Sequence, residues 1–172
     1  MTYKFKLKFH KSKIEHWASR YDYKNEDVIC NSLAPTLQRK KYLTKDDFMF
    51  LCRWKSPRPT KQAAKNDEAF IIEATKIALT TPNPRLSIEV LTLLRGVSWP
   101  VASVILHFGK DNEYPILDYR ALWSLSVDQP RAYDFELWSS YSNFCNILAN
   151  ESGVSMRVLD RALWQYSKEK QK

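Results

Sequence analysis

The amino-acid sequence predicts an all-α protein, a compact two-lobed helical bundle within a single domain spanning residues 1–172. Three glycines in 172 residues argue against a sheet with many tight turns and against a Gly-rich phosphate-binding loop. Hydrophobic residues make up 44% of the chain, which is enough for one globular core. Short turns such as Thr81–Pro84 separate segments of helical periodicity, and none of these turns is long enough to link independent domains.

The first segment, residues 3–9, alternates aromatic or aliphatic residues with lysines, which is the period of an extended chain. Two interpretations of this short extended arm are open. It is a basic arm that lies along DNA, or its apolar side packs on the helices while its lysines stay in solvent. We favour packing, because the apolar side chains need a surface to cover them.

Helix signals follow along the rest of the chain. Thr44 is expected to cap a helix that has Asp46 and Asp47 in its first turn, as suits the positive end of a helix dipole. This helix stops at Lys55-Ser56-Pro57-Arg58-Pro59, because proline disfavours helical geometry in the residue before it. The other expected helices cover residues 11–20, 25–40, 61–79, 85–94, 99–109, 118–126, 133–150 and 155–170.

The stretch around Gly96 predicts a helix-hairpin-helix over residues 86–109. One helix ends near Leu94, the chain turns through Gly96 and Val97, and a second helix opens with Ser98 as N-cap and Pro100 in its first turn. The first amides of a helix have no partner within the helix and lie at the positive end of its dipole. A phosphate binds there without help from a basic side chain, so double-stranded DNA is the expected partner.

These residues resemble the helix-hairpin-helix DNA glycosylase superfamily, the group of endonuclease III and its relatives. The family motif reads L-P-G-V-G-x-K-x-A, and Leu94, Gly96, Val97 and Ala102 stand at matching positions. The family's aspartate follows the first glycine of the hairpin by 22 residues, which is Asp118 here. The resemblance covers residues 44–126, between a basic segment at 1–43 and further helices at 127–172. It departs from the family at the second hairpin glycine, where Ser98 stands.

The resemblance implies which residues do the chemistry. Asp118 would be the catalytic carboxylate that stabilises an oxocarbenium-like sugar. An ordinary role as helix N-cap is also sufficient to explain an aspartate at this position. Pro100 stands where bifunctional members have their lysine, so no imine forms and the enzyme would be monofunctional. The expected base pocket consists of Tyr119, Trp54, Trp123 and Arg120.

DNA contacts are expected from two segments. In the family, the loop after the helix that corresponds to residues 46–54 inserts a wedge side chain into the duplex. Trp54 is equally well explained as a core residue, whereas the cations around it favour DNA contact. The expected contacts are Leu94, Arg95, Gly96, Val97, Ser98 and Trp99 in the hairpin and Arg53, Lys55, Ser56 and Arg58 in the loop.

No metal centre is predicted from the cysteines or histidines. Cys30, Cys52 and Cys145 are widely spaced, so the iron–sulfur cluster of many relatives is expected to be absent, and His107 is expected in the core. The resemblance implies one ion, a Na⁺ or K⁺ held by hairpin carbonyls. Those carbonyls would belong to Thr92, Leu94 and Val97.

Charge agrees with a polyanionic partner. The formal net charge is +8, and residues 1–65 contain 16 Lys and Arg against 6 Asp and Glu, whereas residues 66–172 contain 11 against 13. We therefore expect the basic surface on the N-terminal part, although a generically basic soluble protein would show the same charge. No apolar run approaches the roughly 18 residues that span a membrane, and a cytoplasmic, nucleoid-associated protein is expected.

The sequence thus predicts a DNA-binding protein that is a monofunctional DNA glycosylase, excising a modified base in base-excision repair. Two other functions are open. The chain is a non-catalytic helix-hairpin-helix module that binds DNA, or the hairpin packs on another protein. Salt dependence separates the last from the first two, because phosphate contacts weaken steeply with ionic strength.

Overall fold

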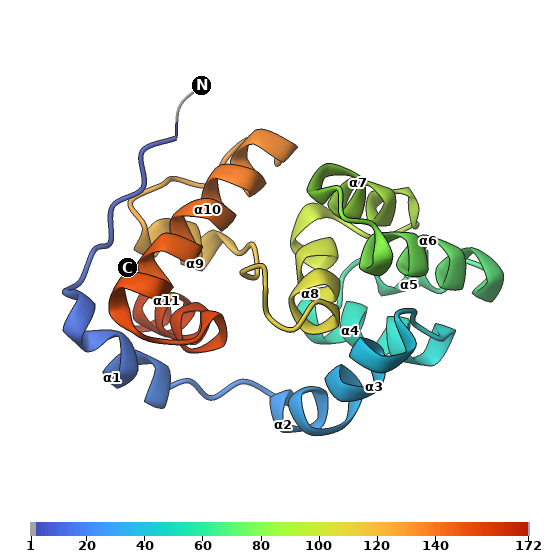
Figure 1. Ribbon diagram of the computed structural model, residues 1–172, viewed down its shortest axis with the longest axis horizontal. Helices are drawn as coiled ribbons and strands as arrows, with labels where there is room; N and C mark the ends of the chain where they lie inside the picture. Colours follow the sequence, from blue (N-terminus) through green and yellow to red (C-terminus); the bar gives the residue numbers. More distant parts are fainter. Residues whose placement is uncertain (1–2, 172) are drawn as a thin grey trace. The chain divides into compact units, whose positions relative to one another are not determined.

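Helices are the regular secondary structure of residues 3–171, which are the residues that the computed structural model describes. No strand forms within this range, so the predicted all-α class is confirmed. The chain folds as two units (Figure 1). One unit joins Met1–Asp22 to Tyr114–Lys172, and the other is the continuous segment Tyr23–Glu113. We call them the split unit and the continuous unit.

The continuous unit begins with short helices and continues through longer ones. Its elements are α2 (Glu26–Val28), a π-helical turn (Ile29–Leu33), α3 (Ala34–Lys40), α4 (Lys45–Lys55), α5 (Thr60–Ala63), α6 (Glu68–Thr80), α7 (Pro84–Glu89), a 3₁₀ turn (Val90–Leu93) and α8 (Trp99–Gly109). Thr44 caps α4 as predicted, since its hydroxyl accepts a hydrogen bond from the amide of Asp47.

One predicted helix of this unit is divided in two. The sequence predicts a single helix over 61–79, whereas α5 ends at Ala63 and α6 begins at Glu68. Asp67 causes the new start, because its extended backbone and its carboxylate, which accepts from the amide of Phe70, form an N-cap. Asp67 followed by Glu68 is a helix-start signal. The apolar residues on both sides keep a helical spacing, and this spacing hides the signal.

Helix α8 forms the centre of the continuous unit. It lies against α3, α4, α6 and α7, and every residue from Val101 to Gly109 is buried. His107 is among them, fully buried, where the sequence places it. The buried side chains of α8 explain why its sequence is apolar on all sides rather than on one stripe.

The split unit is built around α11 (Met156–Lys170), which lies against α1 (Ile14–Ser19), α9 (Tyr119–Ser124) and α10 (Phe135–Ser152). A 3₁₀ turn (Lys11–Lys13) precedes α1. Asp118, Asp134 and Ser155 cap α9, α10 and α11, each accepting a backbone N–H in the first turn. Gly153, with φ of +65°, ends α10 in the left-handed conformation common after helices.

The extended N-terminal segment packs on this unit. The amides of Lys6 and Lys8 donate to the carbonyls of Leu125 and Ser124, each over 2.9 Å. Along residues 3–10 exposure alternates, with the apolar side chains half-buried and the lysines exposed. Phe5 lies 5.3 Å from Phe144 between ring centroids. Packing, the favoured interpretation of this segment, is confirmed.

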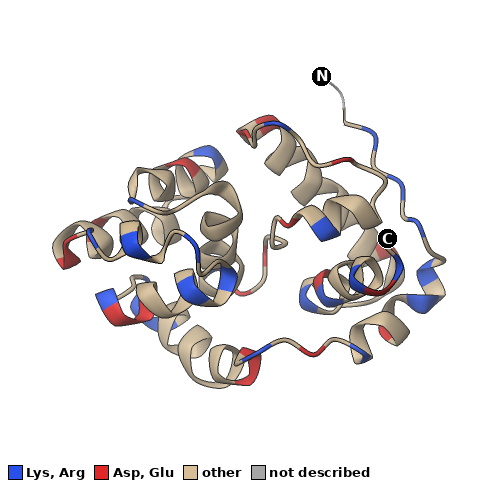
Figure 2. Ribbon diagram, turned by 180° about the vertical axis from the view of Figure 1, so that it is seen from behind, with Lys and Arg blue, Asp and Glu red and all other residues tan. Residues whose placement is uncertain are grey.

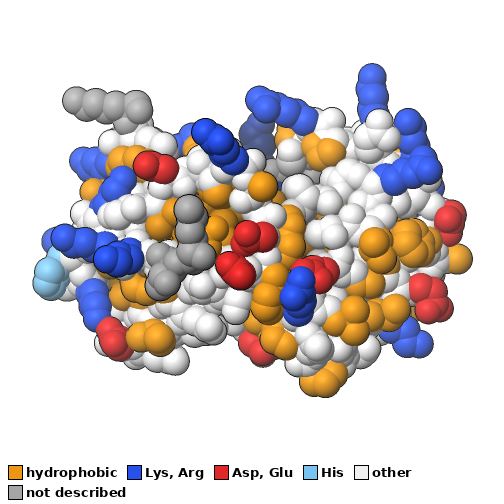
Figure 3. Space-filling model, turned by 90° about the horizontal axis from the view of Figure 1, so that it is seen from above, with side chains coloured by type: hydrophobic (Ala, Val, Ile, Leu, Met, Phe, Trp, Pro, Cys, Tyr) orange, Lys and Arg blue, Asp and Glu red, His pale blue; other side chains and the backbone are white. Residues whose placement is uncertain are grey.

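Basic charge is shared evenly between the units. The split unit contains 13 Lys and Arg against 9 Asp and Glu, and the continuous unit 14 against 10. The excess of basic residues in residues 1–65 is therefore divided between the two units, because residues 1–22 fold with residues 114–172. Figure 2 shows Lys and Arg on helices of both units, and Figure 3 shows them at several separate places on the face that it draws. No helix in residues 3–171 is long and apolar enough to cross a membrane.

Candidate nucleic-acid interface

The hairpin lies in the continuous unit between α7 and α8. The 3₁₀ turn Val90–Leu93 extends α7, and the chain then reverses through Leu94–Val97, where the amide of Val97 donates to the carbonyl of Leu94 over 3.1 Å. Leu94 and Val97 are buried, whereas Arg95 and Ser98 are exposed. The apolar residues of the motif anchor the turn, and its polar residues face solvent.

Gly96 is required at the turn for two reasons. Its φ of +78° lies in the left-handed region, which costs residues with a Cβ about 1–2 kcal/mol. A Cβ on Gly96 would also lie 2.8 Å from both the carbonyl oxygen of Pro59 and the amide nitrogen of Ala63. The turn is therefore seated directly on the start of α5.

Asn66 holds the same turn from the side. Its Nδ2 donates to the carbonyl of Arg95 and its Oδ1 accepts from the amide of Arg95, both over 2.9 Å, and the residue is 4% exposed. Both backbone groups of Arg95 are thus occupied by one buried amide. Asn66 is not predicted as a site residue, because nothing near it in the chain signals a partner 29 residues away.

The start of α8 leaves backbone amides without a partner inside the protein. Ser98 has the extended backbone of an N-cap, but its hydroxyl makes no capping hydrogen bond, and the first helical bond runs from Ala102 to the carbonyl of Ser98. Pro100 has no N–H, so the amides of Trp99 and Val101 are the donors of this first turn. Among the described residues no side chain caps them, which suits an external anion.

The polar loop after α4 lies beside the hairpin, since Pro59 contacts Gly96. Arg53 and Arg58 are exposed, and the guanidinium of Arg53 donates back to the carbonyl of Met49 over 3.1 Å. Lys55 and Ser56 are half-buried. The structure therefore brings the two predicted DNA-contact segments together within one unit.

Trp54 packs within the continuous unit. Its Nε1 donates to the carbonyl of Lys24 over 2.8 Å, and its ring meets those of Tyr23 and Phe108 edge-on, at 5.2 and 5.8 Å between centroids. The indole N–H is therefore already used. A role for Trp54 in the base pocket stays a prediction. In that role Trp54 would stack a base on its ring face, because its N–H is already bonded.

Asp118 begins α9 in the split unit. Its Oδ1 accepts from the amide of Arg120 over 2.8 Å, so the capping interpretation is confirmed. The residue is half-buried. Its carboxylate also acts on neighbouring groups, since the pKa of Tyr133 is raised first by burial and then by the negative charge of Asp118.

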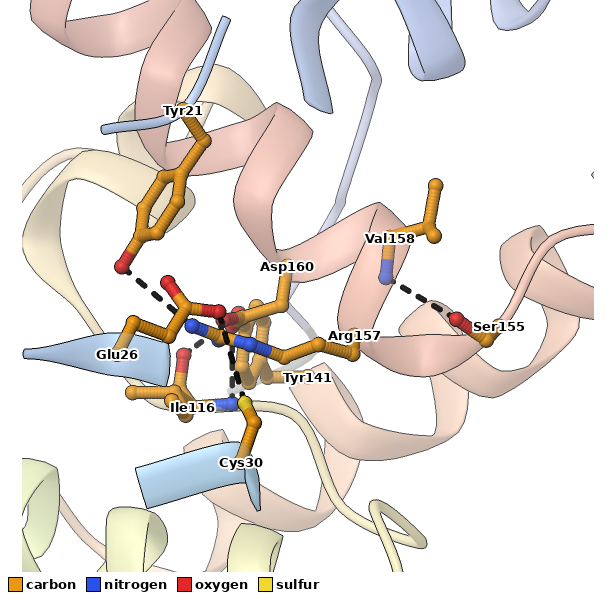
Figure 4. A network of polar contacts seen from close by, with 9 residues as sticks. All are labelled: Tyr21, Glu26, Cys30, Ile116, Tyr141, Ser155, Arg157, Val158 and Asp160. Carbon is orange, nitrogen blue, oxygen red and sulfur yellow. Dashed lines mark hydrogen bonds and ion pairs between the residues drawn. The ribbon is translucent and has the colours of Figure 1, made fainter. Parts of the chain in front are cut away.

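A buried polar network fixes the chain just before Asp118 (Figure 4). The carboxylate of Asp160 accepts from the amide of Ile116 over 3.1 Å, and the hydroxyl of Tyr141 donates to the carbonyl of Ile116 over 3.0 Å. Arg157 forms an ion pair with Asp160, and both are less than a tenth exposed. Both backbone groups of Ile116 are thus held by side chains, two residues before the candidate catalytic carboxylate.

The predicted base-pocket residues divide between the units. Tyr119 is 40% exposed beside Asp118, with the guanidinium of Arg120 5.2 Å from its ring centroid. Trp123, on the same helix, has the Nζ of Lys8 3.5 Å above its ring. Tyr119 and Arg120 therefore lie with Asp118 at the start of α9, whereas the N-terminal segment covers Trp123 and Trp54 belongs to the continuous unit.

The cysteines are free thiols, and two of them are fully buried. Burial raises the pKa of Cys52 to about 12 and that of Cys145 further, so both remain protonated at neutral pH. Within residues 3–171 no cluster of His, Cys, Asp and Glu could hold a metal. Of the carbonyls expected to hold a monovalent cation, that of Leu94 already accepts from Val97.

Comparisons with protein-family models, with curated proteins and with solved structures gave no match to this chain.

Proposed function

We propose that this protein binds duplex DNA through the hairpin of the continuous unit. The observation that carries this proposal is the uncapped start of α8, whose free amides belong to Trp99 and Val101 and which follows the exposed Arg95 of the turn. Gly96 and Asn66 hold the turn in place before any ligand arrives. A preformed anion site at a helix N-terminus fits a backbone phosphate, and a net charge of +8 favours association with DNA. The cytoplasm, at the nucleoid, is the compartment that fits this partner.

We further propose that the protein excises a modified base as a monofunctional DNA glycosylase. Asp118 supplies the carboxylate that stabilises positive charge on the deoxyribose and helps a water to attack. Tyr119, the exposed aromatic next to it, supplies a ring face for an extruded base. With Pro100 at the position of the family's lysine, the strand is not cut through a lysine adduct.

A non-catalytic DNA-binding module is the second candidate, and one observation favours it. The hydrogen bond from the Arg120 amide gives Asp118 a capping role that accounts for an aspartate at this position without any chemistry. This candidate shares the hairpin contact and differs only in base release. A protein-interaction role predicts binding that changes little with salt.

Ser98→Asp tests the hairpin contact. An aspartate at this position would cap α8 with its own carboxylate, raising stability by about 1 kcal/mol while competing with a phosphate for the same amides. We expect a higher melting temperature together with weaker binding to a fluorescently labelled duplex. Asn83→Asp is the matched control, because it adds the same charge at the existing N-cap of α7 in the same unit. Equal affinities of the two variants would contradict the proposed contact.

A further inference from the structure

One face of α11 carries a stripe of cations and an aromatic ring. Arg157, Arg161, Trp164 and Lys168 follow one another at helical spacing, four, three and four residues apart. Arg157 is committed to the buried pair with Asp160, whereas Trp164 is half-buried and Lys168 is exposed. The stripe therefore leads from the buried network in Figure 4 to the surface at the C-terminal end of α11.

Aromatic rings hold these cations in place. The Nζ of Lys168 lies 5.1 Å from the ring centroid of Trp164, and the guanidinium of Arg120, from α9, lies 5.6 Å from the same ring. Tyr21 meets Trp164 edge-on at 5.3 Å, with the guanidinium of Arg161 5.9 Å from the Tyr21 ring. Cation–π contacts order long side chains that would otherwise be mobile at a surface.

Two cations of this cluster, Arg120 and Lys168, form no ion pair among the described residues. Glu169, the acid nearest to Lys168 in sequence, is bound by Arg20 and Gln165. Two ordered, uncompensated cations beside a half-buried tryptophan are characteristic of nucleic-acid surfaces, where guanidinium and ammonium groups bind phosphates and aromatic rings contact sugars and bases. An acidic peptide would use the cations but not the ring.

The cluster also adjoins the candidate catalytic carboxylate. The amide of Arg120 donates to Asp118, so the guanidinium of Arg120 and the carboxylate of Asp118 belong to the same first turn of α9. A phosphate bound by Arg120 would therefore lie near the nucleotide on which Asp118 is proposed to act.

We propose that Arg120 and Lys168, supported by Trp164, form a second DNA-backbone contact that holds the phosphate next to the nucleotide to be excised. This proposal rests on the proposed function and deepens it, because it assigns DNA contact to the split unit as well as to the hairpin. The ligand group is a phosphodiester of duplex DNA.

The test is binding of the full-length double variant Arg120→Gln/Lys168→Gln to a short labelled duplex over a range of salt concentrations. Each phosphate contact contributes about 0.9 to the slope of log affinity against log salt. We expect the slope to fall by nearly two and the affinity at low salt to fall at least about tenfold. The matched control is Lys45→Gln/Lys76→Gln, which removes the same charge from α4 and α6, where no aromatic contact to either lysine forms in the described chain.

Four outcomes separate this proposal from the proposed function. A reduced slope in the cluster variant alone supports it. Equal slopes for the cluster and control variants overturn it, and leave the hairpin contact intact if Ser98→Asp still weakens binding. A reduced slope in the cluster variant with no effect of Ser98→Asp supports the cluster and overturns the hairpin contact. Salt-independent binding, or no binding, by the unchanged protein overturns both.

Discussion

Asp118 caps α9 with the carboxylate that we propose as the catalytic group, and the two roles separate by substitution. Asparagine caps helices about as well as aspartate, whereas alanine does not. We expect Asp118→Asn to unfold at the same urea concentration as the unchanged protein and Asp118→Ala to lose about 1 kcal/mol of stability. A loss of the same size in Asp118→Asn would show that the negative charge itself, rather than the cap, stabilises the helix start.

Gly96 and Gly153 share a left-handed backbone but differ in their surroundings. A Cβ at Gly153 would meet nothing within 4 Å, whereas at Gly96 it would meet two backbone atoms at 2.8 Å. Gly153→Ala should therefore cost only the conformational penalty of about 1 kcal/mol and leave duplex binding unchanged. Gly96→Ala should cost about 3 kcal/mol and weaken binding, because α5 and the turn must move apart. Equal losses in urea unfolding would show that the hairpin is not seated on α5.

For single residues, the sequence predicts side chains that bond backbone groups within one helical turn. It does not predict side chains whose backbone partners are far away in the chain. The N-caps Thr44 and Asp118 are signalled by the residues that follow them within one turn. Asn66, Asp160 and Tyr141 bond backbone atoms 29, 44 and 25 residues away, so no local pattern distinguishes them. They hold the two candidate sites in place.

At the scale of elements, the chain before α9 is held by side chains rather than by regular structure. Asp160→Ala would remove the acceptor of the Ile116 amide and the carboxylate that pairs with the buried Arg157, at a cost of about 3–5 kcal/mol. Tyr141→Phe would remove the bond to the Ile116 carbonyl and the contact of the hydroxyl with the Cys145 thiol, at a cost of about 1–3 kcal/mol. Chemical denaturation measures the loss of stability in both variants. Small and similar losses in the two would mean that water reaches the network and replaces the missing bonds.

Helix boundaries show the limit of periodicity as a guide. The helix over 99–109 is predicted with its bounds, because Ser98, Pro100 and Lys110 punctuate a uniformly apolar run. The boundary at Asp67 is missed because apolar residues continue the helical period on both sides of it. Capping is decided by the local backbone conformation, which a hydrophobic pattern does not record.

For the protein as a whole, the sequence predicts two lobes within one domain but not which segments form each unit. The first 22 residues join the last 59 through contacts between residues far apart in the chain, such as the packing of Phe5 on Phe144 and the hydrogen bonds of Lys6 and Lys8 to Leu125 and Ser124. The continuous unit has its own core around α8, so we expect residues 23–113 alone to fold and unfold cooperatively. Helical circular dichroism with a sigmoidal melt would bear this out, and a gradual melt would show that its core depends on the split unit.

Because two thiols are buried, we expect the free energy of unfolding to decrease at alkaline pH. Burial places the pKa of Cys52 at about 12 in the folded chain, above the value of about 8.5 in an unfolded one. The contribution of the protonated Cys52 thiol to the free energy of unfolding is present in full below about pH 8.5. It is lost as pH rises toward 12, by about 1.4 kcal/mol per pH unit. Urea midpoints should therefore fall above pH 9, and Cys52→Ala should show a weaker fall. If the urea midpoints of Cys52→Ala fell with pH as steeply as those of the unchanged protein, the Cys52 thiol would not be the cause of the fall.

The most direct test of the proposed activity is base release from a panel of duplexes that carry alkylated, oxidised or deaminated bases. The unchanged protein and Asp118→Asn are compared after both are shown to fold and to bind duplex DNA. We predict that the unchanged protein releases a base from at least one duplex without cutting the strand and that Asp118→Asn releases none. Salt-sensitive binding without release from any duplex, or equal release by both proteins, would contradict the account of Asp118 as the catalytic carboxylate.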